Sequence, residues 1–144
     1  MICKWIEYQS DEYKEMLALR SEVLRKPLGL TFSNEQLLAE ANDYFLGGYN
    51  QGNLVACLKL TLLSEHVFQL KQMAVSPKYQ GKGLGAKLVT FAEDFSKKKG
   101  MRSIELHARQ SAIGFYKKLG YQTYGEEFFE VGIPHISMQK IILQ

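Results

Sequence analysis

The sequence predicts an α/β (α+β) protein with a mixed, mostly antiparallel β-sheet and helices on both faces of that sheet. Two observations lead to this fold class. Apolar residues recur at strand spacing in some runs and at helical spacing in others, in the order β-α-α-β-β-β-α-β-α-β-β. Three of the strand-like runs follow one another with short polar connections, which favours an antiparallel meander.

The composition favours one globular domain over residues 1–144. Hydrophobic residues make up 46% of the chain and charged residues 23%, a balance that can close a core. The net charge is +3 without a basic stripe interleaved with aromatics, so we expect no nucleic-acid partner. No apolar run approaches the roughly 18 residues of a membrane span and no export signal is visible, so we expect a cytoplasmic protein without membrane contact.

The cysteines and histidines indicate neither a disulfide nor a metal site. Cys3 and Cys57 lie in apolar, strand-like runs, and two thiols without metal spacing are expected to be buried and reduced. His66, His107 and His135 are too far apart in the sequence to show the spacing of a metal site. We therefore expect no metal.

The first half of the chain begins with a strand-like run over residues 2–8 and a helix from about Asp11 to Arg25, capped by Ser10. Arg20 falls inside the apolar stripe of this helix. One explanation is a snorkelling side chain or an internal ion pair, and the other is an anion-binding group at the edge of a cleft.

A short helix is predicted in "SNEQLLAEAND", capped at Ser33 or Asn34. The runs "YFLGGY" and "LVACLKLTLL" flank "NQGN", whose Asn and Gly residues tolerate positive φ, so a hairpin is expected there. The third run of the meander is "HVFQLKQMAV".

The second half starts with a helix over residues 83–99 that ends at Gly100. In the strand "SIELHA" that follows, Ser103, Glu105 and His107 share the polar face. A shorter helix closed by Gly120 comes next, and the last two strands are "YQTYGEEFFE" and "ISMQKIIL" around the connection "VGIPH".

The loop "QGKGLGAK" admits three phosphate-binding interpretations. The Walker pattern fails, because Ala86 stands where its second Gly belongs and Leu88 stands where Ser or Thr must bind magnesium. The dinucleotide fingerprint G-x-G-x-x-A is satisfied, but "SPKYQ" separates the loop from its strand and little chain remains for further parallel strands. The third pattern is Q-x-x-G-x-G between a strand and a helix, filled by Gln80, Gly83 and Gly85.

This third pattern, together with "SAIGFYKKLGY" about thirty residues later, resembles the GNAT superfamily of acetyl-CoA-dependent N-acetyltransferases. The later element is similar to the A-x-x-F-Y-x-x-x-G-Y element of that superfamily. The resemblance covers most of the chain from Leu54 onward. It implies a GNAT-like fold and an N-acetyltransferase that moves the acetyl group of acetyl-CoA to an amine by direct attack through a tetrahedral intermediate.

A glycine loop ahead of a helix suits a diphosphate for physical reasons. The helix N-terminus has unpaired N–H groups and about half a positive charge, and glycines remove the Cβ atoms that would hold phosphate oxygens away. Gly83 and Gly85 also permit positive φ, and the amide of Gln80 can close the concavity from the side. Lys82 either adds charge toward a ribose phosphate or is simply solvated.

The resemblance also implies roles for individual residues. Backbone groups at the end of the strand before the loop would pair with the pantetheine arm of acetyl-CoA, and one N–H there would stabilise the oxyanion. Tyr116 matches the tyrosine that protonates the leaving thiolate, and Arg109 stands where relatives carry Asn or Gln. The implied cofactor-binding residues are Met73, Ala74, Val75, Gln80, Gly81, Lys82, Gly83, Leu84, Gly85, Ala86, Arg109, Phe115 and Tyr116.

The general base is left open by the sequence. Many relatives carry a glutamate on the strand before the loop, where this chain has Gln69 and Lys71. The alternatives are His135, Glu130 and a water-relayed base, because the tail "EVGIPHISM" holds two titratable groups. Arg20 and Arg25 suggest an acceptor that bears a carboxylate or a phosphate, in a pocket built from the first helix, its following loop and the tail.

Two functions of different class follow. The first is an acetyltransferase for an amine acceptor, expected to be a small molecule. The second is a non-catalytic acyl-CoA-binding sensor or regulatory module, which the missing strand glutamate favours and Tyr116 disfavours. Dimerisation is common among members of the superfamily, so a homodimer is compatible with either function.

Overall fold

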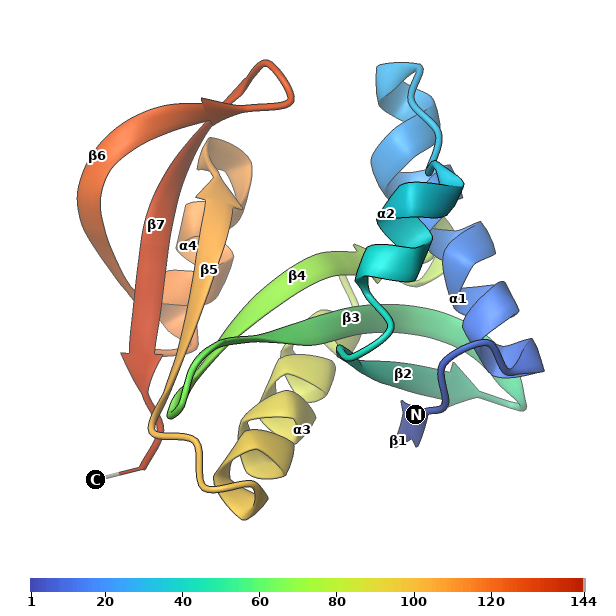
Figure 1. Ribbon diagram of the computed structural model, residues 1–144, viewed down its shortest axis with the longest axis horizontal. Coiled ribbons are helices and arrows are strands. Elements are labelled where there is room, and N and C mark those ends of the chain that lie inside the picture. Colours follow the sequence, from blue (N-terminus) through green and yellow to red (C-terminus); the bar gives the residue numbers. More distant parts are fainter. Residues whose placement is uncertain (144) are drawn as a thin grey trace. The chain divides into compact units, whose positions relative to one another are not determined.

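The computed structural model describes residues 1–143, and its elements follow the predicted order (Figure 1). The strands are β1 (Ile2–Ile6), β2 (Tyr44–Asn50), β3 (Asn53–Ser64), β4 (Val67–Val75), β5 (Ser103–Arg109), β6 (Gln122–Glu130) and β7 (Ile133–Ile141). The helices are α1 (Asp11–Arg20), α2 (Asn34–Ala39), α3 (Leu84–Lys98) and α4 (Ile113–Lys118).

The strands form a seven-stranded sheet in the order β1-β2-β3-β4-β5-β7-β6. β1 with β2, β2 with β3, β5 with β7 and β6 with β7 pair antiparallel, whereas β4 pairs parallel with β5 over Val67–Leu70. The predicted fold class, a mixed and mostly antiparallel sheet with helices, is therefore confirmed.

By its internal contacts the chain divides into two compact units. The first, here called the N-terminal unit, comprises Met1–Thr61 and Lys71–Ala92, and the second, the C-terminal unit, comprises Leu62–Leu70 and Glu93–Gln144. The single domain over residues 1–144 stays a prediction.

Helix α1 begins where its sequence predicts. The hydroxyl of Ser10 accepts a hydrogen bond from the N–H of Tyr13 (3.1 Å), which satisfies one donor of the first turn. After Arg20 the chain continues as one turn of π-helix over Ser21–Arg25, so the predicted helix to Arg25 covers both segments. Helix α2 is capped by Ser33, one of the two predicted caps, in a capping box with Gln36.

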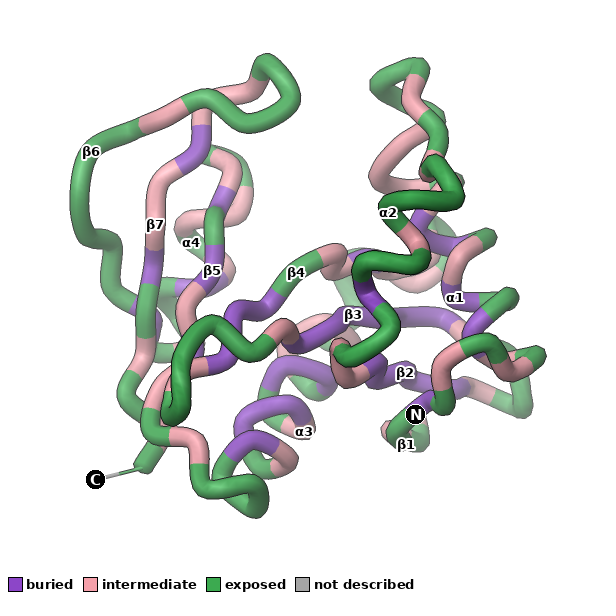
Figure 2. Tube along the Cα trace, in the orientation of Figure 1, coloured by how far each residue is buried: buried purple, intermediate pink, exposed green. Residues whose placement is uncertain are grey.

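The core of the N-terminal unit lies between α1 and the strands. Tyr13, Met16 and Leu19 of α1 pack with Ile6, Phe45, Tyr49, Cys57 and Ala74 in one buried cluster. The alternate residues of β3, Ala56, Leu58 and Leu60, are also fully buried, so both faces of this strand are covered (Figure 2). Burial raises the pKa of the Cys57 thiol to about 12. Cys57 is therefore buried as predicted, whereas Cys3 is half-buried; both are free cysteines.

The predicted hairpin joins β2 to β3, with Asn50 opposite Asn53. Its two central residues, Gln51 and Gly52, both have positive φ, at 52° and 81°. This is the left-handed pair that a two-residue hairpin turn requires.

In the C-terminal unit, Ile104, Leu106 and Ala108 of β5 are buried on one face and the polar residues alternate with them, as predicted. On the buried side, the hydroxyl of Tyr121 donates to Oε2 of Glu93 (2.9 Å). Nζ of Lys140 donates to both oxygens of the same carboxylate (3.0 and 3.2 Å). These contacts fix the end of α4 against α3 and β7.

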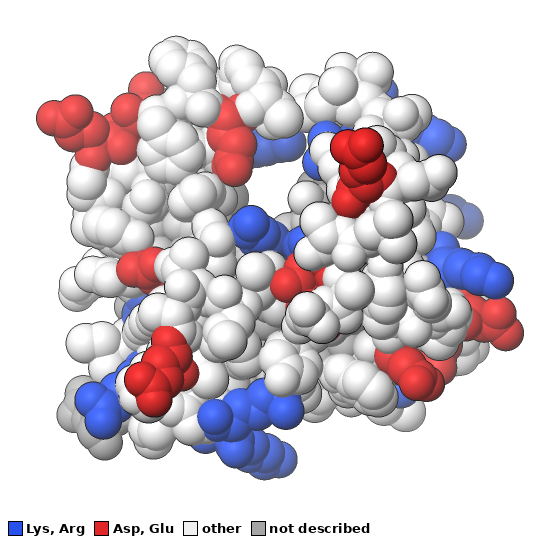
Figure 3. All heavy atoms as spheres, viewed as in Figure 1, with Lys and Arg blue, Asp and Glu red and all other residues white. Residues whose placement is uncertain are grey.

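No helix within residues 1–143 combines the length and the apolar composition that a membrane crossing requires. Figure 3 draws Lys and Arg in blue and Asp and Glu in red, and side chains of both signs are present on the face that it shows. The expectation of no nucleic-acid partner stays a prediction.

Candidate active site

The glycine loop of the N-terminal unit is an exposed turn directly ahead of α3. Gln80, Gly81, Lys82 and Gly83 are all exposed, and Gly81 and Gly83 each have a φ of +78°. A Cβ atom at either glycine would meet no protein atom within 4 Å, so the space beside the backbone is open. The prediction of positive φ is confirmed for Gly83 and wrong for Gly85, which is helical, because α3 begins one residue before it. Gly81 supplies the second left-handed position.

The first turn of α3 leaves backbone donors toward this open space. The N–H of Lys87 donates to the carbonyl of Gly83 (3.2 Å). The N–H groups of Leu84, Gly85 and Ala86 come before this bond and have no acceptor four residues back inside the helix. Two left-handed glycines therefore precede free backbone donors at the positive end of the dipole of a fifteen-residue helix. A diphosphate fits this arrangement.

Gln80 ties the loop to the end of β4. Its amide Nε2 donates to the carbonyl of Val75 (2.9 Å), so the amide nitrogen holds the loop in place. Lys82 places its ammonium over the ring of Tyr79, 5.4 Å from the centroid. The Gln80 side chain thus orients the loop, while its predicted direct contact with the phosphate stays a prediction.

Strand β4 contains a left-handed residue just before Met73, Ala74 and Val75. Gln72 has a φ of +55°, a conformation that costs a non-glycine residue about 1–2 kcal/mol. Its amide Oε1 is buried and has no hydrogen-bond partner among the described residues. Ala74 is buried, and Met73 and Val75 are half-buried. The pairing of β4 with β5 covers Val67–Leu70, so it ends before these three residues, which fits the expected pairing of their backbone with the pantetheine arm.

Tyr116 lies on α4 in the C-terminal unit and is almost fully buried, at 6% exposure. Its ring packs edge-to-face against Phe115 (centroids 4.9 Å apart) and Tyr121 (5.7 Å). Its hydroxyl has no hydrogen-bond partner within the part of the chain that the structure describes. Burial raises the pKa of Tyr116 to about 12. A phenol is protonated at neutral pH in any case, as a proton donor must be, and the raised pKa extends this protonated state above pH 10.

His135 and Glu130 lie next to each other. Nδ1 of His135 is 2.7 Å from the carbonyl oxygen of Ile133, and a carbonyl can only accept, so Nδ1 carries the proton. In the neutral ring the lone pair is then on Nε2, which is 3.7 Å from Oε2 of Glu130. His135 is buried (7% side-chain exposure), whereas Glu130 is half exposed (48%). This is an imidazole whose free nitrogen faces a carboxylate.

A third residue of this group, His107, is not among the site residues that the sequence predicts. Its Nδ1 is 3.4 Å from Oε1 of Glu130, and its Nε2 is 3.3 Å from the amide Nε2 of Gln69. The ring of Phe128 lies edge-on to His107 (4.8 Å) and stacked with His135 (6.1 Å). The sequence does place His107 on the polar face of its strand, and this was the one indication that it could belong to the site. Glu130 is thus held between two imidazoles, and Gln69, which stands where relatives carry a glutamate, supports one of them.

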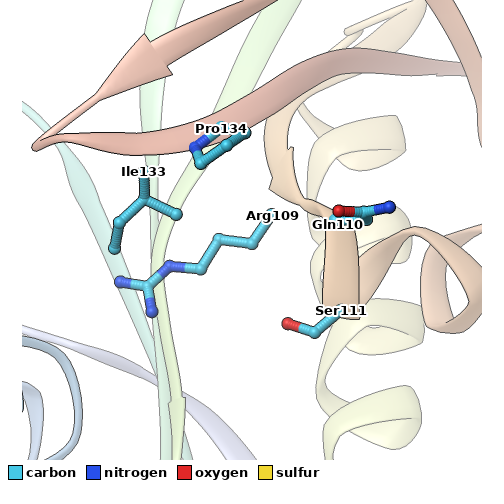
Figure 4. A pocket seen from close by; sticks show the side chains of 5 residues that line it. All are labelled: Arg109, Gln110, Ser111, Ile133 and Pro134. Atoms are coloured by element: carbon cyan, nitrogen blue, oxygen red, sulfur yellow. The ribbon is translucent and has the colours of Figure 1, made fainter.

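A cavity of about 520 Å³ opens beside His135, lined by Arg109, Gln110, Ser111, Ile133 and Pro134 (Figure 4). Arg109 ends β5 and is paired in register with His135 of β7. In Figure 4 its side chain extends from β5 past Pro134 toward Ile133. The cavity therefore contains a cation next to the two strand residues that precede His135.

Arg20 is occupied by an internal ion pair, one of its two expected alternatives. It is 1% exposed, and its NH1 and NH2 donate to Oε1 and Oε2 of Glu40 at 2.9 and 3.0 Å. The guanidinium groups of Arg20 and Arg25 both lie over the ring of Phe32, 4.6 and 4.5 Å from its centroid. The assignment of Arg20 to the acceptor is corrected, since its paired nitrogens are used up by a buried carboxylate. Arg25 stays a prediction.

This chain is similar to known proteins in both its sequence and its fold. A model of the acetyltransferase (GNAT) family matches residues 5–121. The uncharacterised protein YyaT of Bacillus subtilis strain 168 is 43% identical over 77 residues, which cover 54% of this chain and 52% of that protein. The alignment thus spans about half the length of this relative.

Two crystal structures share the fold. A protein of Lactobacillus plantarum superposes with a TM-score of 0.86 at 23% identity, over 99% of this chain and all of its own. An aminoglycoside 6′-N-acetyltransferase complexed with coenzyme A superposes with a TM-score of 0.81 at 19% identity, over 100% of this chain and 98% of its own. At these identities the likeness concerns the fold alone, and the family follows from the match over residues 5–121: the chain belongs to the acetyltransferase (GNAT) family.

Proposed function

We propose that the protein transfers the acetyl group of acetyl-CoA to the amine of a small acceptor molecule. The observation that carries the proposal is the exposed loop with two left-handed glycines ahead of α3. Family membership and the crystal structure of a coenzyme A complex with the same fold support it. In this proposal the loop binds the diphosphate through the N–H groups of Gly83, Leu84, Gly85 and Ala86.

The reaction needs a neutral amine and a leaving thiolate that is protonated. We assign the second task to Tyr116, because it stands where the family carries the tyrosine that protonates the leaving thiolate, and its phenol is protonated at neutral pH. As the C–S bond breaks, the electron pair goes to sulfur and the phenolic proton neutralises it. The new C–N bond forms to the amine nitrogen.

We assign the removal of the amine proton to Nε2 of His135. Because Nδ1 donates to Ile133, Nε2 is the nitrogen that can accept a proton, and the imidazolium that results would face the carboxylate of Glu130. Glu130 acts through the histidine in this assignment, and His107 orients Glu130. The roles mirror those of a histidine base with a carboxylate partner in other enzymes.

The rival function is a module that binds acyl-CoA without catalysis. The missing glutamate on β4 is the feature that favours it, since Gln69 and Lys71 stand at the corresponding positions. The cluster of His135, Glu130 and His107 in the C-terminal unit weakens this argument, because it offers a base in place of the missing glutamate.

The test has a binding step and a turnover step. Acetyl-CoA at a hundredfold excess over its Kd should stabilise the folded protein by roughly 2.7 kcal/mol and raise the Tm by several degrees, whereas NADH and ATP should not. Release of free thiol is then measured with a library of amines. Binding with amine-dependent release supports the transferase, binding without release for any amine supports the sensor, and a Tm that acetyl-CoA leaves unchanged rejects both.

A further inference from the structure

The guanidinium of Arg109 is a cation in a cavity without a counter-ion. Arg109 is half-buried, and within residues 1–143 the structure records no hydrogen bond or ion pair of its side chain. The other lining residues, Gln110, Ser111, Ile133 and Pro134, are uncharged. Arginine stays protonated at all relevant pH values, and a partly desolvated cation is stabilised by an anion. The cavity therefore suits a negatively charged group.

The cavity adjoins the cluster to which proton removal is assigned. Arg109 and His135 are directly opposite each other on β5 and β7, so their side chains are on the same face of the sheet. His107 lies two residues before Arg109 on β5 and thus on that face as well, about 7 Å away along the strand. A carboxylate, two imidazoles and an unpaired guanidinium are therefore close together on one surface of the C-terminal unit.

We infer that the acceptor is an amine that carries a carboxylate, which Arg109 binds. This inference rests on the proposed acetyl transfer and names the class of its acceptor. The amine would approach His135 and Glu130, while the carboxylate pairs with the guanidinium through two parallel hydrogen bonds. The hydroxyl of Ser111, which faces the same open space in Figure 4, is a further donor for it.

A carboxylate fits better than a phosphate. A planar guanidinium matches the two oxygens of a carboxylate, and one positive charge balances one negative charge. A phosphate dianion would leave a charge uncompensated beside the apolar side chains of Ile133 and Pro134. Residues directly opposite each other on neighbouring strands, as Arg109 and His135 are, have Cβ atoms about 4.5–5.5 Å apart, which suits a short molecule with its two charged ends a few bonds apart.

The experiment compares amino acids with their carboxamides as acceptors. Glycine, β-alanine, 4-aminobutyrate, 6-aminohexanoate and a panel of α-amino acids are each supplied as the free acid and as the amide, and thiol release is recorded. We expect the acid of the accepted length to have a KM roughly 10- to 100-fold below that of its amide, the range for a hydrogen-bonded charge pair.

The variant Arg109→Met should raise the KM of the acid by the same factor and leave the KM of the amide and of acetyl-CoA unchanged. Arg109→Lys, which keeps the charge and loses the planar fork, should lie between wild type and Arg109→Met. The control is Arg102→Met, which removes an equal charge from an exposed position of the same unit and should change none of these values. Circular dichroism verifies that each variant is folded.

Several results would overturn the inference. One is equal use of acids and amides by the wild type, and another is an Arg109→Met variant that loses affinity for acetyl-CoA and keeps its affinity for the acceptor. The second result would place Arg109 at the cofactor, the role that the family resemblance implies. If no amine accepts the acetyl group, the proposed function fails, and calorimetric binding of the acids to wild type and Arg109→Met, with CoA present, still decides whether this cavity binds carboxylates.

Discussion

The guanidinium of Arg20 and the carboxylate of Glu40 form a bidentate pair in the interior of the N-terminal unit, with both side chains at most 3% exposed. The hydroxyl of Tyr13 also donates to Glu40, and Nζ of Lys59 bridges Glu40 and Asp43 at 2.9 Å to each. The pair thus connects α1 to the end of α2 and to β3. Removal of one partner leaves the other as an uncompensated buried charge.

We predict that Arg20→Met lowers the free energy of unfolding by about 3–5 kcal/mol, the range for breaking a buried ion pair. The KM of the acceptor should not change in the protein that remains folded, because the arginine is occupied by Glu40. Urea unfolding and thiol release measure the two quantities.

The matched control is Arg25→Met. Arg25 stacks on the same Phe32 ring but is half-buried, so its loss should cost about 1 kcal/mol or less. A rise in acceptor KM for Arg20→Met, with stability unchanged, would restore Arg20 as an acceptor ligand and contradict the ion-pair interpretation.

Glu40 also predicts how stability depends on pH. Burial by itself would raise the pKa of Glu40, but hydrogen bonds from Arg20, Tyr13 and Lys59 outweigh burial and hold the pKa below its ordinary value of 4.5. A carboxyl with a lowered folded-state pKa binds protons more readily when unfolded. Its stabilisation is therefore complete above about pH 5 and is lost as the pH falls through the folded-state pKa.

We expect the free energy of unfolding of wild type to decrease from pH 6 to pH 3 more steeply than that of Glu40→Gln, measured by urea titration at each pH. Glu22→Gln, which changes an exposed glutamate of the same unit, should follow the wild-type slope. Parallel slopes for all three proteins would show that Glu40 is not the group responsible.

Much of the fold could be predicted because local periodicity decides it. Ser10 and Ser33 mark helix starts by their capping chemistry, and the alternation of β5 separates Ile104, Leu106 and Ala108 from the polar face. The partner of Arg20 could not be predicted in this way. Glu40 is twenty residues further along the chain, and its position depends on how α2 packs. The stripe of α1 showed only that Arg20 faces inward.

The candidate site was predictable where one segment contains the information. The glycine loop is such a segment. Whether Gly81 or Gly85 joins Gly83 in adopting a positive φ, however, depends on the residue at which α3 begins. The pair of His107 and Glu130 is different, because it requires the order β5-β7-β6 and an irregularity in β6. Between the pairs Tyr124–Ser137 and Phe128–His135, β6 advances four residues while β7 advances two. This bulge shifts the register that brings Glu130 between the histidines, and no local pattern reports it.

The glycine loop gives a third prediction. An alanine at Gly83, with its φ of +78°, is strained and puts a methyl group into the space that a diphosphate would use. We expect Gly83→Ala to raise the KM of acetyl-CoA roughly tenfold, equivalent to about 1.4 kcal/mol, with the acceptor KM unchanged.

Gly52→Ala is the control for backbone strain, since Gly52 has a nearly equal φ of +81° in the hairpin between β2 and β3. This variant should lose similar stability, about 1–2 kcal/mol, and keep its affinity for acetyl-CoA. If both variants bind acetyl-CoA as wild type does, the loop does not hold the diphosphate.

The histidine cluster gives a fourth prediction. His135→Gln should lower kcat/KM for the acceptor by roughly 10²- to 10⁴-fold, because it removes the nitrogen that takes the amine proton. Glu130→Gln should cost less, roughly tenfold, because the imidazole remains and only its partner changes. His66→Gln alters an exposed histidine of the same unit and should leave the rate unchanged. Wild-type turnover in His135→Gln would instead favour a base relayed through water.

The last prediction concerns Tyr116. Since no described residue shares a hydrogen bond with its hydroxyl, Tyr116→Phe should leave the free energy of unfolding nearly unchanged, while kcat falls by roughly 10²- to 10⁴-fold and acetyl-CoA binding persists. Tyr121→Phe provides the opposite pattern. It breaks the buried hydrogen bond to Glu93, which should cost about 1–3 kcal/mol of stability, and kcat should hold.

The pKa of Tyr116, raised to about 12 by burial, adds a pH criterion. A raised pKa keeps the proton on the phenol as the pH increases, so its ionisation should cause no loss of kcat between pH 7 and pH 10. A Tyr116→Phe enzyme that retains wild-type kcat at saturating acceptor would remove this tyrosine from the reaction and leave protonation of the thiolate to solvent.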